Sequence, residues 1–397
     1  MRTGARPGIA LRLTALAAAA SSLVAVVSGA TGWTSAHRVV AALALPPLLA
    51  VVAASVVAHR RLLAPSLAAL ALFGAAAAIT APGLHLASAA LALAGACALA
   101  ASCLRGDAVE RGRLRDYLTL TKPRIMSLLL VTGACGMVVG ARGWPGTARF
   151  AVTMIGLALA CGGASALNHV LDRDIDRLMG SRTAGRPVAA GRLAPSLALE
   201  FGLALSACSF TLLASTVNLL TAALALAGNL FYVVVYTGYL KRRGPQNIVL
   251  GGAAGAVPPL VGFAAATGNL ALPALWLFLI VFLWTPPHFW ALALLLREHY
   301  AAAKVPMLPV VRGERATVRR IVLYTVALVC FTVVPFALGA FGLVYLVCAL
   351  VLGALFLVLA LRLGRGDDDR RRAALAFHYS LLYLALLFVG AAVDAAL

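Results

Sequence analysis

The chain has 397 residues, of which 62% are hydrophobic and 12% are charged, and its formal net charge at pH 7 is +20. Soluble domains have about 25% charged residues, so this composition excludes an ordinary soluble domain and indicates a membrane protein. The basic residues lie in short groups between apolar stretches rather than along one polar face. We therefore expect no nucleic-acid partner, and we attribute the charge to membrane orientation and to anionic lipid or substrate.

Apolar stretches of about 18 to 24 residues recur from one end of the chain to the other, and each can cross a hydrocarbon core of about 30 Å as a helix. Because backbone polar groups in lipid must be hydrogen-bonded within each segment, we predict an all-α, polytopic membrane helical bundle. The thirteen predicted transmembrane helices span 8–30, 38–58, 63–81, 84–104, 124–141, 149–171, 196–215, 218–239, 247–267, 271–295, 319–338, 341–362 and 374–396.

A polar stretch, 104-LRGDAVERGRLRDYLTLTKP-123, separates the first four predicted helices from the last nine. We therefore predict a four-helix membrane domain over 1–104, a cytoplasmic linker over 105–123 and a nine-helix domain over 124–397. With the N-terminus in the cytoplasm, the basic groups fall in the inside loops, as the positive-inside rule requires. This predicts a multi-pass protein of the plasma membrane with its motif loops on the cytoplasmic side.

Three of the thirteen acidic residues lie within five positions, in 168-NHVLDRDIDR-177. On a helix, Asn168, Asp172 and Asp176 share one face, whereas Asp174 points elsewhere. Like charges at this spacing repel each other, and a Mg²⁺ ion that bridges one or two carboxylates to substrate phosphates would offset the repulsion. The alternative interpretation is an ordinary solvated helix end that nearby arginines neutralise.

The loop after this motif, 177-RLMGSRTAGRPVAAGR-192, is rich in arginine. Arginine presents a fork of donors that suits phosphate oxygens, which makes Arg177, Arg182 and Arg186 candidates for binding a diphosphate. Simple positive-inside charge is the alternative explanation for these arginines.

The motif and four other stretches resemble a known family over about 115–396. The chain is similar to the UbiA-like intramembrane prenyltransferases, and within them to the protohaem IX farnesyltransferases, the haem O synthases. NxxxDxxxD alone indicates the superfamily, whereas WTPPHFWALAL together with VPMLPVV is typical of the haem branch. The other stretches that carry the resemblance are 116-DYLTLTKPRIMSLLL-130, 236-YTGYLKRRGPQNIVLGGAAGAVPPLVG-262, 284-WTPPHFWALAL-294 and 305-VPMLPVVRG-313.

The resemblance implies an enzyme that transfers the farnesyl group of farnesyl diphosphate to a vinyl group of haem b, giving haem O. It implies that Asn168, Asp172 and Asp176 hold a Mg²⁺ bound to the diphosphate, with Tyr236 and Lys241 beside it. Further candidates for the diphosphate are Arg242, Lys122 and Arg124. An equally open interpretation of Lys241 and Arg242 is a topology anchor at a helix end. The alternative functions are prenylation of a quinone-ring precursor and, without catalysis, a transporter or structural bundle.

His288 lies near the middle of a predicted span, where an ionisable side chain is a functional candidate. It is a candidate to orient the haem or to ligate its iron. The alternative is a core histidine bonded to a backbone carbonyl that the neighbouring prolines leave free. Trp284 and Trp290 are candidates for the wall of the haem site, with aromatic packing as the other interpretation.

One stretch departs from the family pattern. Where the family usually has an acidic residue followed by Asp-Tyr, this chain reads 297-REHY-300, which places His299 at the aspartate position. Either Glu298 or His299 is therefore a candidate ligand of a second metal. Without them, one Mg²⁺ must suffice.

Residues 1–104 weakly resemble one half of haem A synthase, a four-helix bundle that binds haem. The predicted topology places His37 and His85 at the outer ends of their helices, as a bis-histidine haem site would require. The alternatives are two interfacial histidines, or a docking module for haem A synthase or for cytochrome oxidase assembly. The implied partners are farnesyl diphosphate, haem b and the lipid bilayer.

Overall fold

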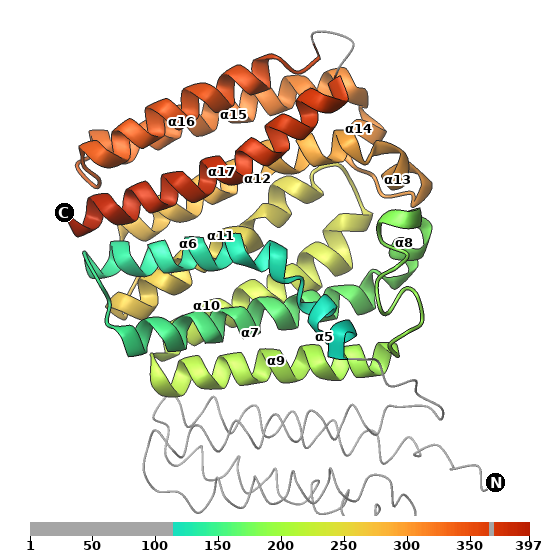
Figure 1. The fold of residues 1–397 in the computed structure, drawn as a ribbon, viewed down its shortest axis with the longest axis horizontal. Helices are drawn as coiled ribbons and strands as arrows, with labels where there is room; N and C mark the ends of the chain where they lie inside the picture. The colour runs from blue at the N-terminus through green and yellow to red at the C-terminus, as the bar shows by residue number, and fades with distance from the viewer. Residues whose placement is uncertain (1–113, 365–368) are drawn as a thin grey trace, which may run out of the picture. The chain divides into compact units, whose positions relative to one another are not determined.

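A computed structural model describes residues 114–364 and 369–397 (Figure 1). The four predicted helices before residue 105, the proposed haem ligands His37 and His85, and most of the linker lie outside the described residues. In the described ranges the chain forms helices and no strand, in agreement with the predicted all-α class.

Nine helical segments of the described ranges are long and apolar enough to cross a membrane, as predicted for this part of the chain. Between them lie the short elements α5 (Leu114–Thr121), α8 (Arg173–Leu178), η2 (Gly180–Arg182), α13 (Arg297–Ala302) and α14 (Leu308–Val311). The nine segments are α6 (Pro123–Ala141), α7 (Thr147–Leu171), α9 (Pro195–Thr216), the run Leu219–Arg242, α11 (Asn247–Thr267), α12 (Leu272–Leu295), α15 (Gly313–Ala337), α16 (Leu343–Leu361) and α17 (Asp369–Ala396).

Two of the nine helices begin more than a turn earlier than predicted. α15 begins at Gly313 rather than at 319, and α17 at Asp369 rather than at 374. The residues added to α15 include Arg315 and those added to α17 include Arg370, Arg371 and Arg372, and arginine is a good helix former. Hydropathy detects only the apolar part of a helix, whereas an existing helix gains one hydrogen bond for each residue that it adds. The helices therefore continue beyond the stretch that hydropathy identifies.

The chain divides into two compact units, and the first contains, among the described residues, 114–122, Ala158–Val170 and Arg186–Ala223. Its buried cluster joins α5, the end of α7 and the start of α9 through Leu120, Ala166 and Ala198. The hydroxyl of Ser165 donates to the carbonyl of Leu120 at 2.6 Å. Because that carbonyl ends a helix, the bond satisfies an acceptor that has no partner within α5.

The second unit contains Pro123–Leu157, Leu171–Gly185 and Leu224–Leu397. Small residues let α6 and α11 pack backbone to backbone, as helices commonly do in membranes. A Cβ atom on Gly136 would lie 2.9 Å from Cα of Pro259, and one on Gly262 would lie 2.9 Å from the carbonyl carbon of Gly133. Neither position has room for a side chain.

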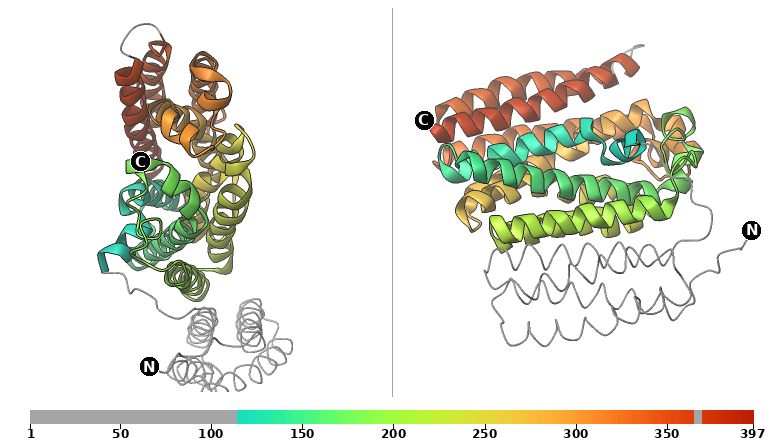
Figure 2. Two further views of the ribbon diagram at one scale, coloured as in Figure 1. Left: turned by 90° about the vertical axis from the view of Figure 1, so that its right-hand side faces the viewer. Right: turned by 60° about the horizontal axis from the view of Figure 1, so that its bottom comes forward.

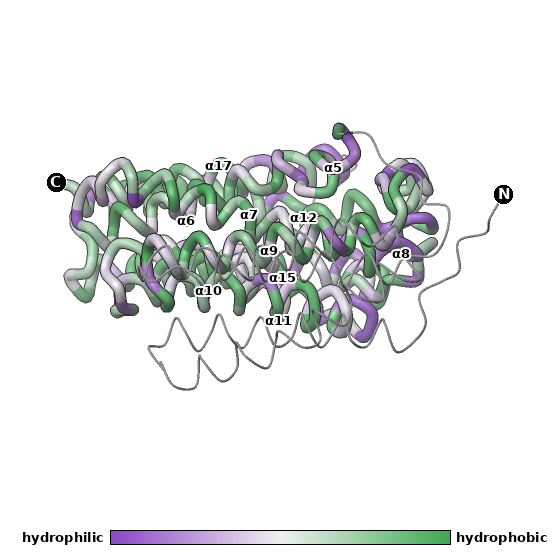
Figure 3. Tube along the Cα trace, turned by 90° about the horizontal axis from the view of Figure 1, so that it is seen from below, coloured by the Kyte–Doolittle hydropathy of each residue, from purple (hydrophilic) through white to green (hydrophobic). Residues whose placement is uncertain are grey.

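The other helices of this unit, α12, α15, α16 and α17, pack around a large apolar core (Figure 2). Tyr345 of α16 and Tyr383 of α17 are fully buried in it together with Phe356 and Phe388. Hydrophobic residues follow the long helices, whereas hydrophilic ones gather around α8 (Figure 3). The polar end of this unit is therefore the end that carries the acidic motif.

The run Leu219–Arg242 changes helix type along its length. It begins as α10 (Leu219–Leu230), widens into the π-helix η3 (Phe231–Tyr239) and tightens into the 3₁₀ turn η4 (Leu240–Arg242). π-Helical turns are rare and occur frequently at functional sites. This one carries Tyr236, and Lys241 lies in the 3₁₀ turn that follows it.

Candidate active site

The acidic motif lies at a helix break. α7 ends at Leu171, and Asp172, with φ −90° and ψ 3°, is the residue before α8. The amide of Asp176 still donates to the carbonyl of Asp172 at 2.8 Å, so the helical hydrogen bonding resumes after the break. Asp172 and Asp176 are 0% and 1% exposed, whereas Asp174 is exposed. The burial pattern expected from the spacing is therefore present, although one continuous helix does not produce it.

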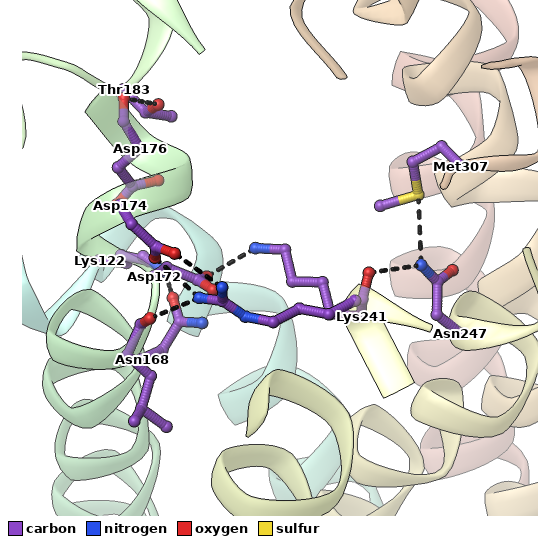
Figure 4. A network of polar contacts seen from close by, with 11 residues as sticks. Lys122, Asn168, Asp172, Asp174, Asp176, Thr183, Lys241, Asn247 and Met307 are labelled. Carbon is purple, nitrogen blue, oxygen red and sulfur yellow. Dashed lines mark hydrogen bonds and ion pairs between the residues drawn. The ribbon is translucent and has the colours of Figure 1, made fainter. Parts of the chain in front are cut away.

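In the first unit, Lys122 donates from Nζ to Oδ1 of Asn168 at 2.8 Å (Figure 4). Lys122 ends α5 with φ 51°, a left-handed conformation that is uncommon for a residue with a side chain. The buried amide of Asn168 and a lysine ammonium therefore meet at the cytoplasmic end predicted for α7. Arg124, another predicted diphosphate ligand, is exposed.

In the second unit, Lys241 pairs with Asp172 across 69 positions of sequence (Figure 4). Nζ of Lys241 lies 2.6 Å from Oδ2 of Asp172, and the two side chains are 12% and 0% exposed. Charge-assisted hydrogen bonds of this length are the strong ones. Such a pair also carries a large desolvation cost, so its retention at a buried position indicates function more than stability.

Arg242, the next residue, pairs with the exposed Asp174. Its two terminal nitrogens lie 2.7 Å from the two carboxylate oxygens of Asp174, and Nη2 also donates to the carbonyl of Leu171 at 2.9 Å. The hydrogen bonds from Arg242 lower the pKa of Asp174 to about 2. Arg242, predicted as a diphosphate ligand, thus fastens η4 to α8 in this structure.

Tyr236 lies within electrostatic range of Asp172 and of Tyr300. Its ring fits against Gly251 of α11, where a Cβ atom would come within 2.9 Å of Cε2. It also packs on a buried cluster that joins α8 to the segments after α12. That cluster positions the acidic motif against Tyr236, and it consists of Ile175, Met179, Ile248, Ala293, Tyr300, Ala303, Val305 and Met307.

The other residues predicted around the diphosphate lie nearer the surface. Arg177, Arg182 and Glu298 are exposed, and Arg186 and His299 are half-buried. Among the described residues, no three His, Cys, Asp or Glu side chains form a group arranged to hold a metal ion. A Mg²⁺ site of one or two carboxylates completed by phosphate oxygens does not require such a group.

The predicted haem residues lie on α12. The rings of Trp284 and His288 stack with their centroids 4.2 Å apart. Trp290 is 0% exposed and packs edge-on against Tyr324 at 5.2 Å. Nδ1 of His288 lies 2.7 Å from Oγ of Ser380, so its partner is a hydroxyl and not the proline-freed carbonyl considered above.

Sequence reasoning missed several contacts of these residues. Asn247 is buried and donates from Nδ2 to the carbonyl of Lys241 at 3.4 Å and towards Sδ of Met307 at 3.8 Å (Figure 4). Ser380 was not singled out either. The available signal was the same for both, namely a small polar side chain beside or inside an apolar span.

Comparison with known proteins agrees with this architecture. Residues 129–382, more than half of the chain, match the UbiA prenyltransferase family. The protoheme IX farnesyltransferase of Thermus thermophilus is 52% identical over 295 residues, which cover 73% of this chain and 48% of that protein. The chain thus spans about half the length of that relative. The enzyme of the same name from Symbiobacterium thermophilum is 52% identical over 290 residues, which cover 72% of this chain and 97% of that protein.

Two solved structures share the fold at low sequence identity. One is a digeranylgeranylglyceryl phosphate synthase, with a TM-score of 0.59 and 19% identity over 71% of this chain and 98% of that one. The other is a UbiA homolog from Archaeoglobus fulgidus bound to DMAPP and Mg²⁺, with a TM-score of 0.54 and 16% identity over 70% of this chain and 99% of that one. With its family match and its similarity along the full length of the Symbiobacterium enzyme, the chain belongs to the UbiA prenyltransferase family, in the branch of the protoheme IX farnesyltransferases.

Proposed function

We propose that the protein transfers the farnesyl group of farnesyl diphosphate to a vinyl group of haem b, making haem O for haem–copper oxidases. The bond between the farnesyl carbon and the diphosphate oxygen breaks, and that carbon bonds to the vinyl group. Water then adds to the other vinyl carbon and a proton leaves. The observation that carries the proposal is the buried pair of Asp172 and Lys241, which joins the acidic motif to η4, the 3₁₀ turn after the π-helix.

The diphosphate-bound Mg²⁺ would be held by the carboxylates of Asp172 and Asp176 and by the amide oxygen of Asn168. The donors fit this ion because they are hard oxygens and because both carboxylates are buried, Asp172 beside the ammonium of Lys241. When bound, Mg²⁺ stabilises the charge that develops on the leaving diphosphate. The Archaeoglobus relative bound to DMAPP and Mg²⁺ supports this assignment.

Lys241 balances the charge of Asp172 in the structure. We expect the ammonium of Lys241 to turn to the diphosphate once Asp172 and Asp176 bind Mg²⁺, because the cation then neutralises the carboxylate of Asp172. Tyr236, beside Asp172, offers its hydroxyl to the same diphosphate. Further cationic donors for the diphosphate are Lys122, Arg124, Arg177, Arg182 and Arg186. Arg242 acts through Asp174, by holding η4 against α8.

The acceptor side of the site is proposed around His288, with Trp284 stacked on it. Trp290, which is fully buried and packs edge-on against Tyr324, is the other candidate for this wall. Glu298 and His299 are the candidates for a second metal. We place the active-site loops and the N-terminus in the cytoplasm and the protein in the plasma membrane, on the strength of the basic loops.

For residues 1–104 we propose a separate membrane domain. It would either bind haem through His37 and His85 or dock haem A synthase or an oxidase assembly partner. The histidine spacing and the weak resemblance support both roles equally.

The test is incubation of the purified full-length protein with haem b, farnesyl diphosphate and Mg²⁺, followed by mass analysis of the extracted haem. We expect a product heavier than haem b by one farnesyl group and one hydroxyl group. The matched variants are Asp172→Asn, which should abolish the product, and Asp174→Asn, which should retain it. Unmodified haem from a folded preparation, or prenylation of a quinone-ring precursor instead, would contradict the proposal.

A further inference from the structure

His288 is held between aromatic rings in the interior of the second unit. Its imidazole stacks on Trp284 at 4.2 Å on one side and on Phe377 of α17 at 4.8 Å, with interplanar angles of 16° and 23°. Phe289 meets the ring edge-on at 5.6 Å. α12 and α17, which carry these rings, pack against each other. The orientation of the imidazole plane is therefore set by its neighbours.

Ser380 determines which nitrogen of this imidazole carries the proton. Its hydroxyl donates its single hydrogen to the carbonyl of Phe377 at 2.6 Å. The hydroxyl oxygen can then only accept from Nδ1 of His288, 2.7 Å away. Nδ1 is thus protonated, and Nε2 of the neutral ring carries a lone pair.

A second hydrogen bond fixes Ser380 itself. Nε1 of the Trp284 indole donates to the carbonyl of Ser380 at 2.8 Å. The same tryptophan therefore stacks on His288 and anchors the residue that orients it. These two hydrogen bonds of Ser380 therefore keep the imidazole of His288 in the tautomer that carries its proton on Nδ1.

Nε2 makes no hydrogen bond within 114–364 and 369–397, and the side chain retains 7% exposure. Burial away from water disfavours the charged imidazolium, because an isolated charge in an apolar setting is costly. A neutral imidazole with an available Nε2 is the form in which histidine ligates metals. Histidine ligands of metals almost always donate their other N–H to a neighbouring group that fixes the ring, and Ser380 occupies that place.

We propose that Ser380 is a positioning residue that holds His288 in the Nδ1–H tautomer, so that Nε2 ligates the iron of the haem acceptor. The inference rests on the proposed function, which makes haem the acceptor. Ligation at the iron would hold the porphyrin in one place while a vinyl group at its edge meets the farnesyl chain. In this arrangement His288 contacts the substrate, and Ser380 acts through His288.

The test measures haem binding apart from catalysis. Full-length protein that carries His37→Ala and His85→Ala, so that the N-terminal domain contributes no histidine-ligated haem, is titrated in detergent with ferric haem b and followed by absorption and electron paramagnetic resonance; all variants are made in this background. His288→Ala should remove a histidine-ligated haem signal that free imidazole restores. Ser380→Ala should weaken haem affinity roughly tenfold or more, the usual effect of losing a partner of a ligating histidine. Ser380→Thr should recover most of that loss, and the KM for farnesyl diphosphate should not change.

The matched control is Thr325→Val, which removes a buried hydroxyl bonded at 2.8 Å to the carbonyl of Ile321. It should leave the haem signal as in the unmodified protein. An unchanged haem signal in His288→Ala would overturn the proposal. If this variant also lost the farnesyl-transfer activity, the role of Nε2 would be that of a proton acceptor instead. The predicted signals without any haem O would support the ligation and reject the proposed function, so the two failures are distinguishable.

Discussion

Replacing Lys241 with methionine tests whether its pair with Asp172 behaves as a buried ion pair or as an ordinary surface ion pair. Lys241→Met keeps a similar apolar stem but removes the ammonium from a carboxylate that is 0% exposed. Removing one partner of a buried pair costs about 3–5 kcal/mol of folding free energy, because the other charge stays in the interior. Each kcal/mol lowers the melting temperature of a medium-sized domain by roughly 2–4 °C, so we expect a drop of at least roughly 6 °C.

The matched control is Arg242→Met, which breaks the neighbouring pair with Asp174. The side chains of that pair are 40% and 57% exposed, and exposed pairs contribute about 0–1 kcal/mol. Thermal unfolding in detergent, with EDTA and then with Mg²⁺, measures both variants. Mg²⁺ should reduce the loss in Lys241→Met, and adding Asp172→Asn should recover stability by removing the second charge. Equal losses in both variants, or no recovery in the double variant, would refute the reasoning.

Three further predictions follow from the same contacts. Asp176→Asn should lower kcat/KM roughly 100-fold, because the loss of one stabilising group in an active site typically has an effect of this size. Asp174→Asn should change kcat/KM only a few-fold, and comparable losses in the two variants would contradict the assignment of Asp176 to the metal site. Gly262→Ala should cost about 1–3 kcal/mol or prevent folding, because the new Cβ would overlap the backbone of Gly133, and an unchanged melting temperature would show that α6 and α11 pack differently. The pKa of Asp174 is lowered to about 2, so its pair with Arg242 stabilises the protein above about pH 4, and this contribution is lost as the pH falls through 2. Melting temperatures of the unmodified protein and of Arg242→Gln should converge at pH 2, and a difference that persists there would contradict this assignment.

Much of the fold could be predicted from the sequence, because the lipid bilayer restricts which structures can cross it. A membrane helix must satisfy its own backbone and present apolar side chains, so length and hydropathy locate it. The nine helices of the described residues agree with this expectation, apart from the polar first turns of α15 and α17. The spacing of the motif likewise indicated that Asp172 and Asp176 share a face that Asp174 does not, and the structure shows that these two carboxylates are the buried ones.

Only the tertiary structure decided how these side chains are paired, because each partner comes from a distant part of the sequence. Nothing local to Lys241 or Arg242 indicates that one binds the buried Asp172 and the other the exposed Asp174. The tautomer of His288 likewise depends on Ser380, which lies 92 positions away on another helix. By itself the sequence determined the membrane bundle, the acidic motif and the family, since these depend on residue type and spacing. The partners of each charge were decided by packing, since burial makes an unpaired polar group costly and so selects one arrangement.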